Sequence, residues 1–355
     1  MRFHVDPEKS SVISGWVVLD DPVASPTVQV SVPGRAPIVI EAKILRSGVK
    51  SRGWHSTGAT GFKIDKRILP DIERLEQIEI HNVETGLLIY RRPQKQHRQE
   101  KLFRYDLQIM PQHQLDALFS AHFSLAYHAI EQYPEEVVTG IVNNRFCDSI
   151  FMSGGPRLGI YEPLLRGKGF RFITVLRDPY EELAERLLLL QYAAKQDFPP
   201  SLMAHLSSLE RVVPLAGTFD IGDDHRLKQA FLNLDDEQRA VLSNPFVRML
   251  ACEGGQTPTN ASVALALQKL AEFDAVGLAT RYDDFKVTLS EVLKVDILRD
   301  HRLSEVSWST ILAPKLAQID RVKDMLALDV ALYTEAQKAI FGVLDAPATR
   351  GRIAR

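Results

Sequence analysis

The sequence predicts an α/β protein in which a three-layer, parallel-sheet domain is preceded by a small all-β sandwich domain. Short β-branched runs, broken by turns that contain proline and glycine, fill residues 1–93. Apolar strands then alternate with helix-periodic segments over residues 102–355, as they do around a mainly parallel sheet. Between the two lies a polar, basic stretch, of which we expect residues 94–101 to be a linker.

In the N-terminal domain, the clearest strand pattern is the alternation of valine with polar residues over 27–32. Segments that contain proline, at 20–22 and 33–37, separate this run from its neighbours. The number and length of the runs are typical of a small β-sandwich. The expected strands cover residues 12–19, 27–32, 38–44, 61–65, 77–81 and 87–90.

In the C-terminal domain, the strongest strand–helix pair is the apolar run 170–176 followed by residues 180–195, where apolar residues recur at helical spacing. Pro179 stands near the first helical position, where its missing N–H does no harm. Glu181 and Glu182 fall in the first turn, where acids favour the helix dipole. Further helices are expected at 201–213, 226–243, 261–272, 284–293, 314–328 and 330–344.

The charge balance is nearly neutral, with 43 basic and 45 acidic residues and a net charge of −2. This argues against a broad surface for nucleic acid or anionic membrane, although the basic run 91–101 leaves nucleic-acid binding as an alternative to a linker. The apolar run 187–194 is too short to span a membrane, and the N-terminus has no signal-peptide core. We therefore expect a cytoplasmic protein, whose oligomeric state the sequence does not specify.

Neither a disulfide nor a metal site is expected. Cys147 and Cys252 are far apart in the chain and lack CxxC spacing, which favours two reduced thiols. None of the ten histidines has metal-ligand spacing to a partner.

The best site candidate from the residues alone is Arg177, at the end of the strand 170–176. In open α/β sheets, ligands bind outside the carboxyl ends of the strands. An arginine there can hold a phosphate with two parallel hydrogen bonds, and the following helix N-terminus favours an anion. The alternative is an Arg177–Asp178 surface pair at a tight turn.

Four segments, in order, resemble carbohydrate sulfotransferases of the heparan-sulfate and bacterial type. The first is the aromatic-rich strand that ends in Leu-Arg-Asp-Pro at 176–179. The others, Ser243–Leu250, Phe273–Asp283 and Leu328–Ala336, are similar to the family's Asn-x-x-x-Arg-x-Leu, Phe-x-x-Val-Gly-x-Thr-Glu-Arg-Phe-Asp and Asp-x-x-Leu-Tyr-x-x-Ala segments. The resemblance implies a P-loop-like sulfotransferase fold. It also implies 3′-phosphoadenosine 5′-phosphosulfate (PAPS) as the cofactor, with Arg177 on its 3′-phosphate.

The chain departs from the family where the sulfate donor binds. The family's loop Ile-Pro-Lys-Thr-x-Gly-Thr-Ser corresponds to residues 107–116, where Gln112 takes the place of the lysine. No glycine lets this backbone close on a phosphate, and Asp116 adds a negative charge. Glu185 stands where the family has a serine that also bonds the 3′-phosphate, so it would repel a phosphate unless the helix is rotated or Arg186 intervenes.

A second anion-binding candidate is the turn Ser-Gly-Gly-Pro-Arg at 153–157, between an expected strand at 148–152 and a helix from Leu158. Gly155 and Arg157 would hold a changed donor there, through backbone N–H groups and a guanidinium. The alternative is an ordinary Gly-Gly-Pro turn.

His113 is the candidate general base, because an imidazole titrates near neutral pH. The alternative is a surface or core histidine without a catalytic role. A subset of the resembling family carries a catalytic histidine in a segment that corresponds to residues 153–159, where this chain has none.

The N-terminal domain resembles a β-sandwich that precedes bacterial glycosyltransferase domains, with its Gly15-Trp16 and Gly61-Phe62 pairs. Trp16 and Trp54 are candidates for stacking on the sugar rings of a carbohydrate acceptor. The alternative is that both are core aromatics.

Three functions follow, and whether the chain is an enzyme stays open. The first is a transferase that sulfates a bacterial surface polysaccharide. The second is a non-catalytic relative that binds a glycan, a nucleotide or a partner in polysaccharide biosynthesis. The third is an enzyme with a changed donor.

Overall fold

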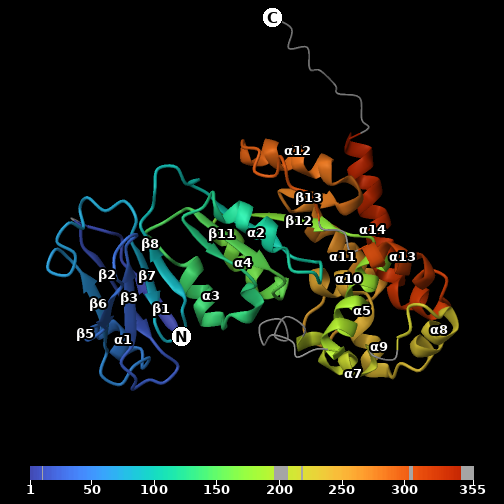
Figure 1. Ribbon diagram of the computed structural model, residues 1–355, viewed down its shortest axis with the longest axis horizontal. Helices are drawn as coiled ribbons and strands as arrows, with labels where there is room; N and C mark the ends of the chain where they lie inside the picture. Colours follow the sequence, from blue (N-terminus) through green and yellow to red (C-terminus); the bar gives the residue numbers. More distant parts are fainter. Residues whose placement is uncertain (10, 196–206, 217–218, 304–306, 345–355) are drawn as a thin grey trace, which may run out of the picture. The chain divides into compact units, whose positions relative to one another are not determined.

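The computed structural model describes residues 1–9, 11–195, 207–216, 219–303 and 307–344 (Figure 1). The chain falls into two compact units. Unit 1 comprises residues 1–103, 114–154 and 162–171, and unit 2 comprises residues 104–113, 155–161 and 172–355. The domain boundary expected at residues 94–101 stays a prediction.

Two antiparallel four-stranded sheets occupy the N-terminal part of unit 1 (Figure 1, blue). The structure divides the expected strand 38–44 into two, and it adds a first strand that was not expected. A sandwich arrangement of the two sheets stays a prediction. In sheet order, the strands are β1 (Arg2–Val5), β2 (Ile13–Val18), β6 (Ala59–Ile64) and β5 (Ile44–Leu45), then β4 (Ile38–Glu41), β3 (Thr27–Ser31), β7 (Glu79–Asn82) and β8 (Leu88–Arg91), with helix α1 (Ser47–Ser51) between β5 and β6.

The two glycine–aromatic pairs of this region face each other across the β2–β6 ladder. Gly15 lies opposite Phe62, and Trp16 lies opposite Gly61. A methyl group at Gly15 would lie 2.7 Å from the Phe62 ring, and one at Gly61 would lie 2.8 Å from Arg46 Nε. Each glycine therefore leaves room for a large side chain, with Phe62 fully buried beneath the sheet and Arg46 crossing its outer surface.

A parallel five-stranded sheet has the order β10-β11-β9-β12-β13. Its pairs β10–β11 and β12–β13 are parallel in register, and β12 is the strand expected from the apolar run at 170–176. The strands are β9 (Lys101–Tyr105), β10 (Leu125–Tyr127), β11 (Ile150–Gly154), β12 (Phe170–Leu176) and β13 (Ala275–Leu278). The helices in sequence between β9 and β12 are α2 (His113–Ser120), η1 (Ile130–Gln132), α3 (Glu135–Val142) and α4 (Leu158–Gly167).

Unit 2 is mainly helical beyond β12 (Figure 1). The helix α5 buries Leu183, Leu187 and Leu190 in a core that it shares with Leu312 and Leu316 of α13. The helices are α5 (Pro179–Lys195), η2 (Ser207–Val212), α7 (Val213–Ala216), α8 (Asp224–Leu232), α9 (Asp236–Leu242), α10 (Pro245–Ala251), α11 (Asn260–Ala271), η3 (Ala279–Arg281), α12 (Tyr282–Leu293), α13 (Ser307–Leu316) and α14 (Asp320–Leu344).

Four of the expected helices differ from the structure. The helix expected at 226–243 is two helices, because Asp235 and Gln238 form a capping box that starts α9. The expected break between 314–328 and 330–344 is wrong, since α14 runs without interruption through residue 329. Residues 201–206 of the helix expected at 201–213 lie outside the described residues, and the remainder is mostly a 3₁₀ turn. Within the described ranges, no helix has the length and apolar character that crossing a bilayer requires.

Candidate functional site

Arg177 directly follows β12 and is buried, with only 3% of its surface exposed. Its guanidinium forms an ion pair with Glu185, two turns into α5, and Glu185 is 1% exposed. Asp178 accepts the N–H groups of Tyr180 and Glu181, so its carboxylate caps α5. The alternative of a surface pair is therefore wrong, because the arginine lies inside the protein.

Burial raises the pKa of Glu185 to about 7, against the attraction of Arg177. The nearby carboxylates of Glu182 and Glu181 raise that pKa further. The second carboxyl oxygen of Glu185 is buried without a hydrogen-bond partner among the described residues. The Glu185 carboxyl therefore takes up a proton at much higher pH than an exposed glutamate does.

Glu182, one turn earlier on α5, is fully buried and binds the loop that corresponds to the family's donor loop. Its Oε1 accepts the N–H of Ile109 at 2.8 Å and the Nε–H of Arg186 at 3.0 Å. The Glu182 carboxylate thus occupies the backbone N–H of Ile109, in the loop that follows β9.

Gln112 and His113 end this loop. The Gln112 side chain donates to the Gln108 side chain at 3.2 Å and to the Met110 carbonyl at 3.0 Å, so it closes the loop on itself. His113 begins α2 and is exposed. The roles expected for Gln112 and His113 stay predictions.

The residues of this strand end do not fit PAPS. In unit 2, Arg177 is paired with Glu185, the Ile109 N–H is bound by Glu182, and position 112 is an uncharged amide. A phosphate in this cluster would lie beside the buried carboxyl groups of Glu182 and Glu185. In this structure, Glu185 of α5 supplies the counter-charge of Arg177.

The Gly-Gly-Pro-Arg turn is closely packed at Gly155. A methyl group there would lie 2.9 Å from both the Asp106 carbonyl oxygen and the Met249 methyl carbon. These neighbours approach the backbone so closely that a glycine fits here better than any larger residue. Arg157 is exposed, and its guanidinium lies beside Gly254. Anion binding by Gly155 and Arg157 stays a prediction.

A polar cluster that the sequence analysis missed joins His128, Ser153 and Asp116 in unit 1. Ser153 Oγ donates to Asp116 Oδ1 at 2.7 Å, and His128 Nδ1 lies 3.0 Å from Ser153 Oγ and 3.3 Å from Asp116 Oδ1. The Ser153 proton therefore goes directly to a carboxylate, which differs from the relay of a serine nucleophile. His128 follows β10 and thus stands at a strand end, where polar site residues of α/β sheets gather.

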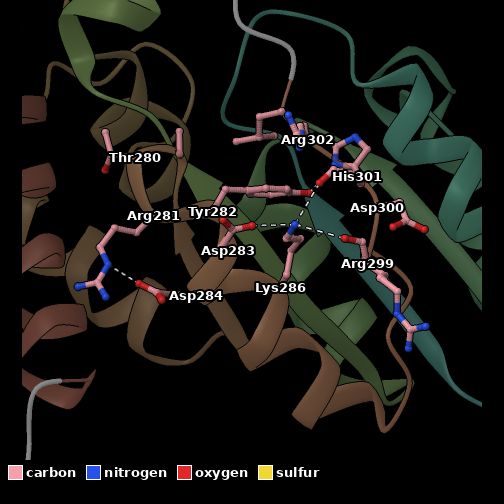
Figure 2. Close-up of a pocket in the computed structure, with 12 residues that line it drawn as sticks. Thr280, Arg281, Tyr282, Asp283, Asp284, Lys286, Arg299, Asp300, His301 and Arg302 are labelled. Carbon is pink, nitrogen blue, oxygen red and sulfur yellow. Dashed lines mark hydrogen bonds and ion pairs between the residues drawn. The ribbon is translucent and has the colours of Figure 1, made fainter.

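An open pocket of about 830 Å³ lies in unit 2 where β13 leads into α12 (Figure 2). The Tyr282 hydroxyl and His301 Nδ1 are 2.8 Å apart, and both side chains are buried. Lys286 pairs with Asp283 at 2.7 Å and donates to the carbonyls of Arg299 and His301, which fastens residues 299–301 to the helix (Figure 2). Burial lowers the pKa of His301, and the Lys286 and Arg104 cations lower it further.

This pocket contains none of the site residues predicted from the sequence. Burial raises the pKa of Tyr282 well above its ordinary value. The Tyr282–His301 pair is thus neutral and hydrogen-bonded at pH 7. Among the residues described here, no group of three or more His, Cys, Asp or Glu side chains could hold a metal ion.

Two of the family-like segments contact each other in unit 2. Asp329, in α14, is fully buried and accepts the N–H groups of Phe246 and Val247 at 3.0 and 2.9 Å. Asn244 Oδ1 accepts the N–H groups of Leu328 and Asp329 in return, at 3.0 and 3.1 Å. These two side chains accept the backbone N–H groups at the start of α10 and in α14, and they hold the two helices together. Their contacts are therefore structural.

Trp16 and Trp54 lie on the outward face of the sheet β1-β2-β6-β5, half-buried, with ring centroids 5.7 Å apart. Neither belongs to the buried hydrophobic core of the described residues, so the alternative of core aromatics is wrong. Their contact with sugar stays a prediction.

No protein-family model matches the chain, and no curated protein matches it. Among solved structures, it is similar to a sulfotransferase from Alicyclobacillus acidocaldarius, with 12% identity and a TM-score of 0.29, over 64% of this chain and 96% of that one. At this identity and TM-score, the likeness carries no argument about activity. The described elements form a mixed α/β protein with one parallel sheet and two antiparallel sheets, which is compatible with a sulfotransferase-like fold.

Proposed function

We propose that this protein is a non-catalytic relative of carbohydrate sulfotransferases, which binds a glycan during bacterial surface-polysaccharide assembly in the cytoplasm. In this proposal, residues 1–93 form a glycan-binding sandwich, joined by residues 94–101 to a sulfotransferase-like domain. The observation that carries the non-catalytic role is the buried Arg177–Glu185 ion pair. The carboxylate supplies the negative charge that a donor phosphate would otherwise bring.

The energetic argument is electrostatic. A phosphate charge about 4 Å from an ionised Glu185 would be repelled by roughly 4 kcal/mol at the effective dielectric constant near a protein surface. That repulsion corresponds to about a thousand-fold weaker binding. Catalysis of sulfate transfer also needs positive charge at the transferred group, which Gln112 does not supply.

The second candidate is an active transferase that moves sulfate from PAPS to the polysaccharide. One observation favours it: the pKa of Glu185 is raised to about 7, so the carboxyl becomes neutral at mildly acidic pH. The attraction between Arg177 and Glu185 would then be weaker, which lowers the cost of placing an anion beside Arg177.

Calorimetric titration of adenosine 3′,5′-bisphosphate, the desulfated donor, separates the two candidates. We expect no binding to the wild-type protein at millimolar ligand and pH 8. Glu185→Ser installs the residue that the resembling family has here, and it should strengthen binding at least tenfold. Glu210→Ser is the control, since Glu210 is an exposed glutamate outside this cluster.

Removing one partner of a buried ion pair destabilises a protein by roughly 3–5 kcal/mol. Glu185→Gln is therefore a second, milder variant, because it keeps the size of the side chain and a carbonyl oxygen that can accept a hydrogen bond from Arg177. Circular dichroism and the melting temperature check that each variant is folded. Micromolar binding of the bisphosphate by the wild-type protein would refute the non-catalytic role and favour the transferase.

A further inference from the structure

We infer that the outward face of the sheet β1-β2-β6-β5 binds an acidic polysaccharide, with tryptophan rings against sugar rings and arginines on carboxylate or sulfate groups. This inference rests on the proposed glycan-binding function and names the chemistry of the polymer. We call the surface the aromatic–cationic face. It comprises Arg2, His4, Trp16, Arg46, Arg52 and Trp54.

Strand register places the aromatic rings of this face together. His4 and Trp16 are cross-strand partners, and their ring centroids are 6.2 Å apart. Trp54 follows α1 and lies beside Trp16, with the two rings tilted by 42°. Neighbouring half-buried rings give the apolar C–H surface of a pyranose a platform that needs little ordering on binding.

Two arginines lie against Trp54. The Arg52 guanidinium is 4.8 Å from the ring centroid, and that of Arg2 is 5.1 Å from it. Arg2 also pairs with Glu136 at 3.0 Å. Arg52 is exposed and forms no ion pair with any described residue. The Trp54 ring therefore positions the Arg52 guanidinium, whose N–H groups remain available to an anion.

A third arginine is fixed beside Trp16. Because Gly61 has no side chain, Arg46 crosses the sheet there, and it donates to the Gly15 carbonyl at 3.1 Å and to Asp6 at 3.2 Å. The position of Arg46 is therefore set by the same glycine that faces Trp16 across the ladder.

The charge of this face is positive, in contrast to the net charge of −2 for the whole chain. Burial lowers the pKa of His4; Asp6 opposes that shift, and Arg145 and Arg46 add to it. His4 is thus neutral at pH 7. The three arginines of the face, Arg2, Arg46 and Arg52, exceed the two carboxylates that pair with them, Asp6 and Glu136, by one positive charge, and Arg145 adds a further positive charge near His4.

Acidic carbohydrate suits this combination better than a neutral sugar or nucleic acid. A planar guanidinium binds carboxylate and sulfate with paired hydrogen bonds, which a neutral sugar cannot accept with equal strength. Single-stranded nucleic acid favours a longer basic groove with a row of stacking rings. Here two tryptophans and one histidine share a compact patch.

The test is calorimetric titration of the full chain with three hexasaccharides: oligogalacturonate, heparin and neutral maltohexaose. We expect both acidic oligosaccharides to bind at least tenfold more tightly than maltohexaose, with affinity that falls as salt rises. Arg52→Gln should weaken acidic binding at least fivefold and leave the melting temperature unchanged. Arg74→Gln, an exposed arginine outside this face, is the matched control and should change nothing.

Trp54→Phe keeps an aromatic ring and protects the fold, and it should weaken binding of both acidic oligosaccharides. Equal binding of maltohexaose, with no effect of Arg52→Gln, would overturn the acidic specificity and leave glycan binding standing. If no hexasaccharide binds, this inference and the glycan half of the proposed function both fail, whereas the bisphosphate titration still decides the non-catalytic half. Tighter binding of an oligothymidylate than of heparin would overturn the inference in favour of nucleic acid.

Discussion

Asp329 should make the protein less stable as the pH rises, and Asp329→Asn should remove most of that dependence. The carboxyl is fully buried, and burial raises its pKa from 3.8 to about 7, although the N–H groups of Val247 and Phe246 lower it in part. Because the folded-state pKa is the higher one, the folded protein binds more protons between pH 4 and pH 7. The stability that the protonated carboxyl contributes is therefore full below pH 4 and is lost as the pH rises through 7.

The size of this effect follows from the shift. A rise from 3.8 to about 7 corresponds to about 4 kcal/mol between the two ends of that range. Asn at position 329 still accepts one backbone N–H but loses the second, at a cost of about 1–2 kcal/mol. At pH 5, wild type has already lost about 1.6 kcal/mol of this stability, so the two proteins should be about equally stable there. The variant should be more stable than wild type at pH 8.

Urea unfolding at pH 5 and pH 8, followed by circular dichroism, measures both quantities. Asp324→Asn changes an exposed aspartate on the same helix and should leave the pH dependence as it is. If Asp329→Asn destabilises the protein equally at both pH values, the carboxyl is ionised as a helix cap and the reasoning is refuted.

Three further changes test other parts of the structure. Gly15→Ala would place a methyl group 2.4 Å from the His4 carbonyl oxygen, so it should destabilise the N-terminal sheets by about 1–3 kcal/mol in urea unfolding. Tyr282→Phe leaves His301 Nδ1 without its partner and should cost about 1–3 kcal/mol by the same measurement. His113→Ala alters an exposed side chain and should change the melting temperature by less than about 2 °C; a larger fall would show that its imidazole is structurally engaged.

Much of the secondary structure was predictable because its patterns are local. The alternation at 27–32 and the apolar run at 170–176 both form strands. Alternation indicates a strand with one buried face, and a continuous apolar run indicates a strand buried on both faces. The break inside 226–243 could also have been predicted, because Asp235 is followed three residues later by Gln238, which is the spacing of a capping box. The helix through residue 329 was missed because a buried aspartate in mid-helix is explained only by a partner 82–83 residues away.

Only the position of the candidate site could be predicted from the sequence. Strand-end rules located Arg177, but the pairing with Glu185 depends on how α5 is turned about its axis, which helical spacing alone does not fix. Likewise, the sequence analysis singled out Trp16 and Trp54 separately, whereas their proximity comes from a turn after α1 that carries no periodic signal. His128 was missed because β10 has only three residues, which is too short for a recognisable strand pattern.

The Arg177–Glu185 pair also explains why the departures from the resembling family occur together. A buried arginine at a strand end needs a counter-charge, and a donor phosphate supplies it only while the donor is bound. A chain that no longer binds the donor would hold an uncompensated cation in its interior at all times. In the proposed non-catalytic role, Glu185 supplies that counter-charge at all times, and a lysine at position 112 would have no donor to bind. Under this proposal, introducing a lysine at position 112 would not by itself create donor binding, because Arg177 would still be paired with Glu185.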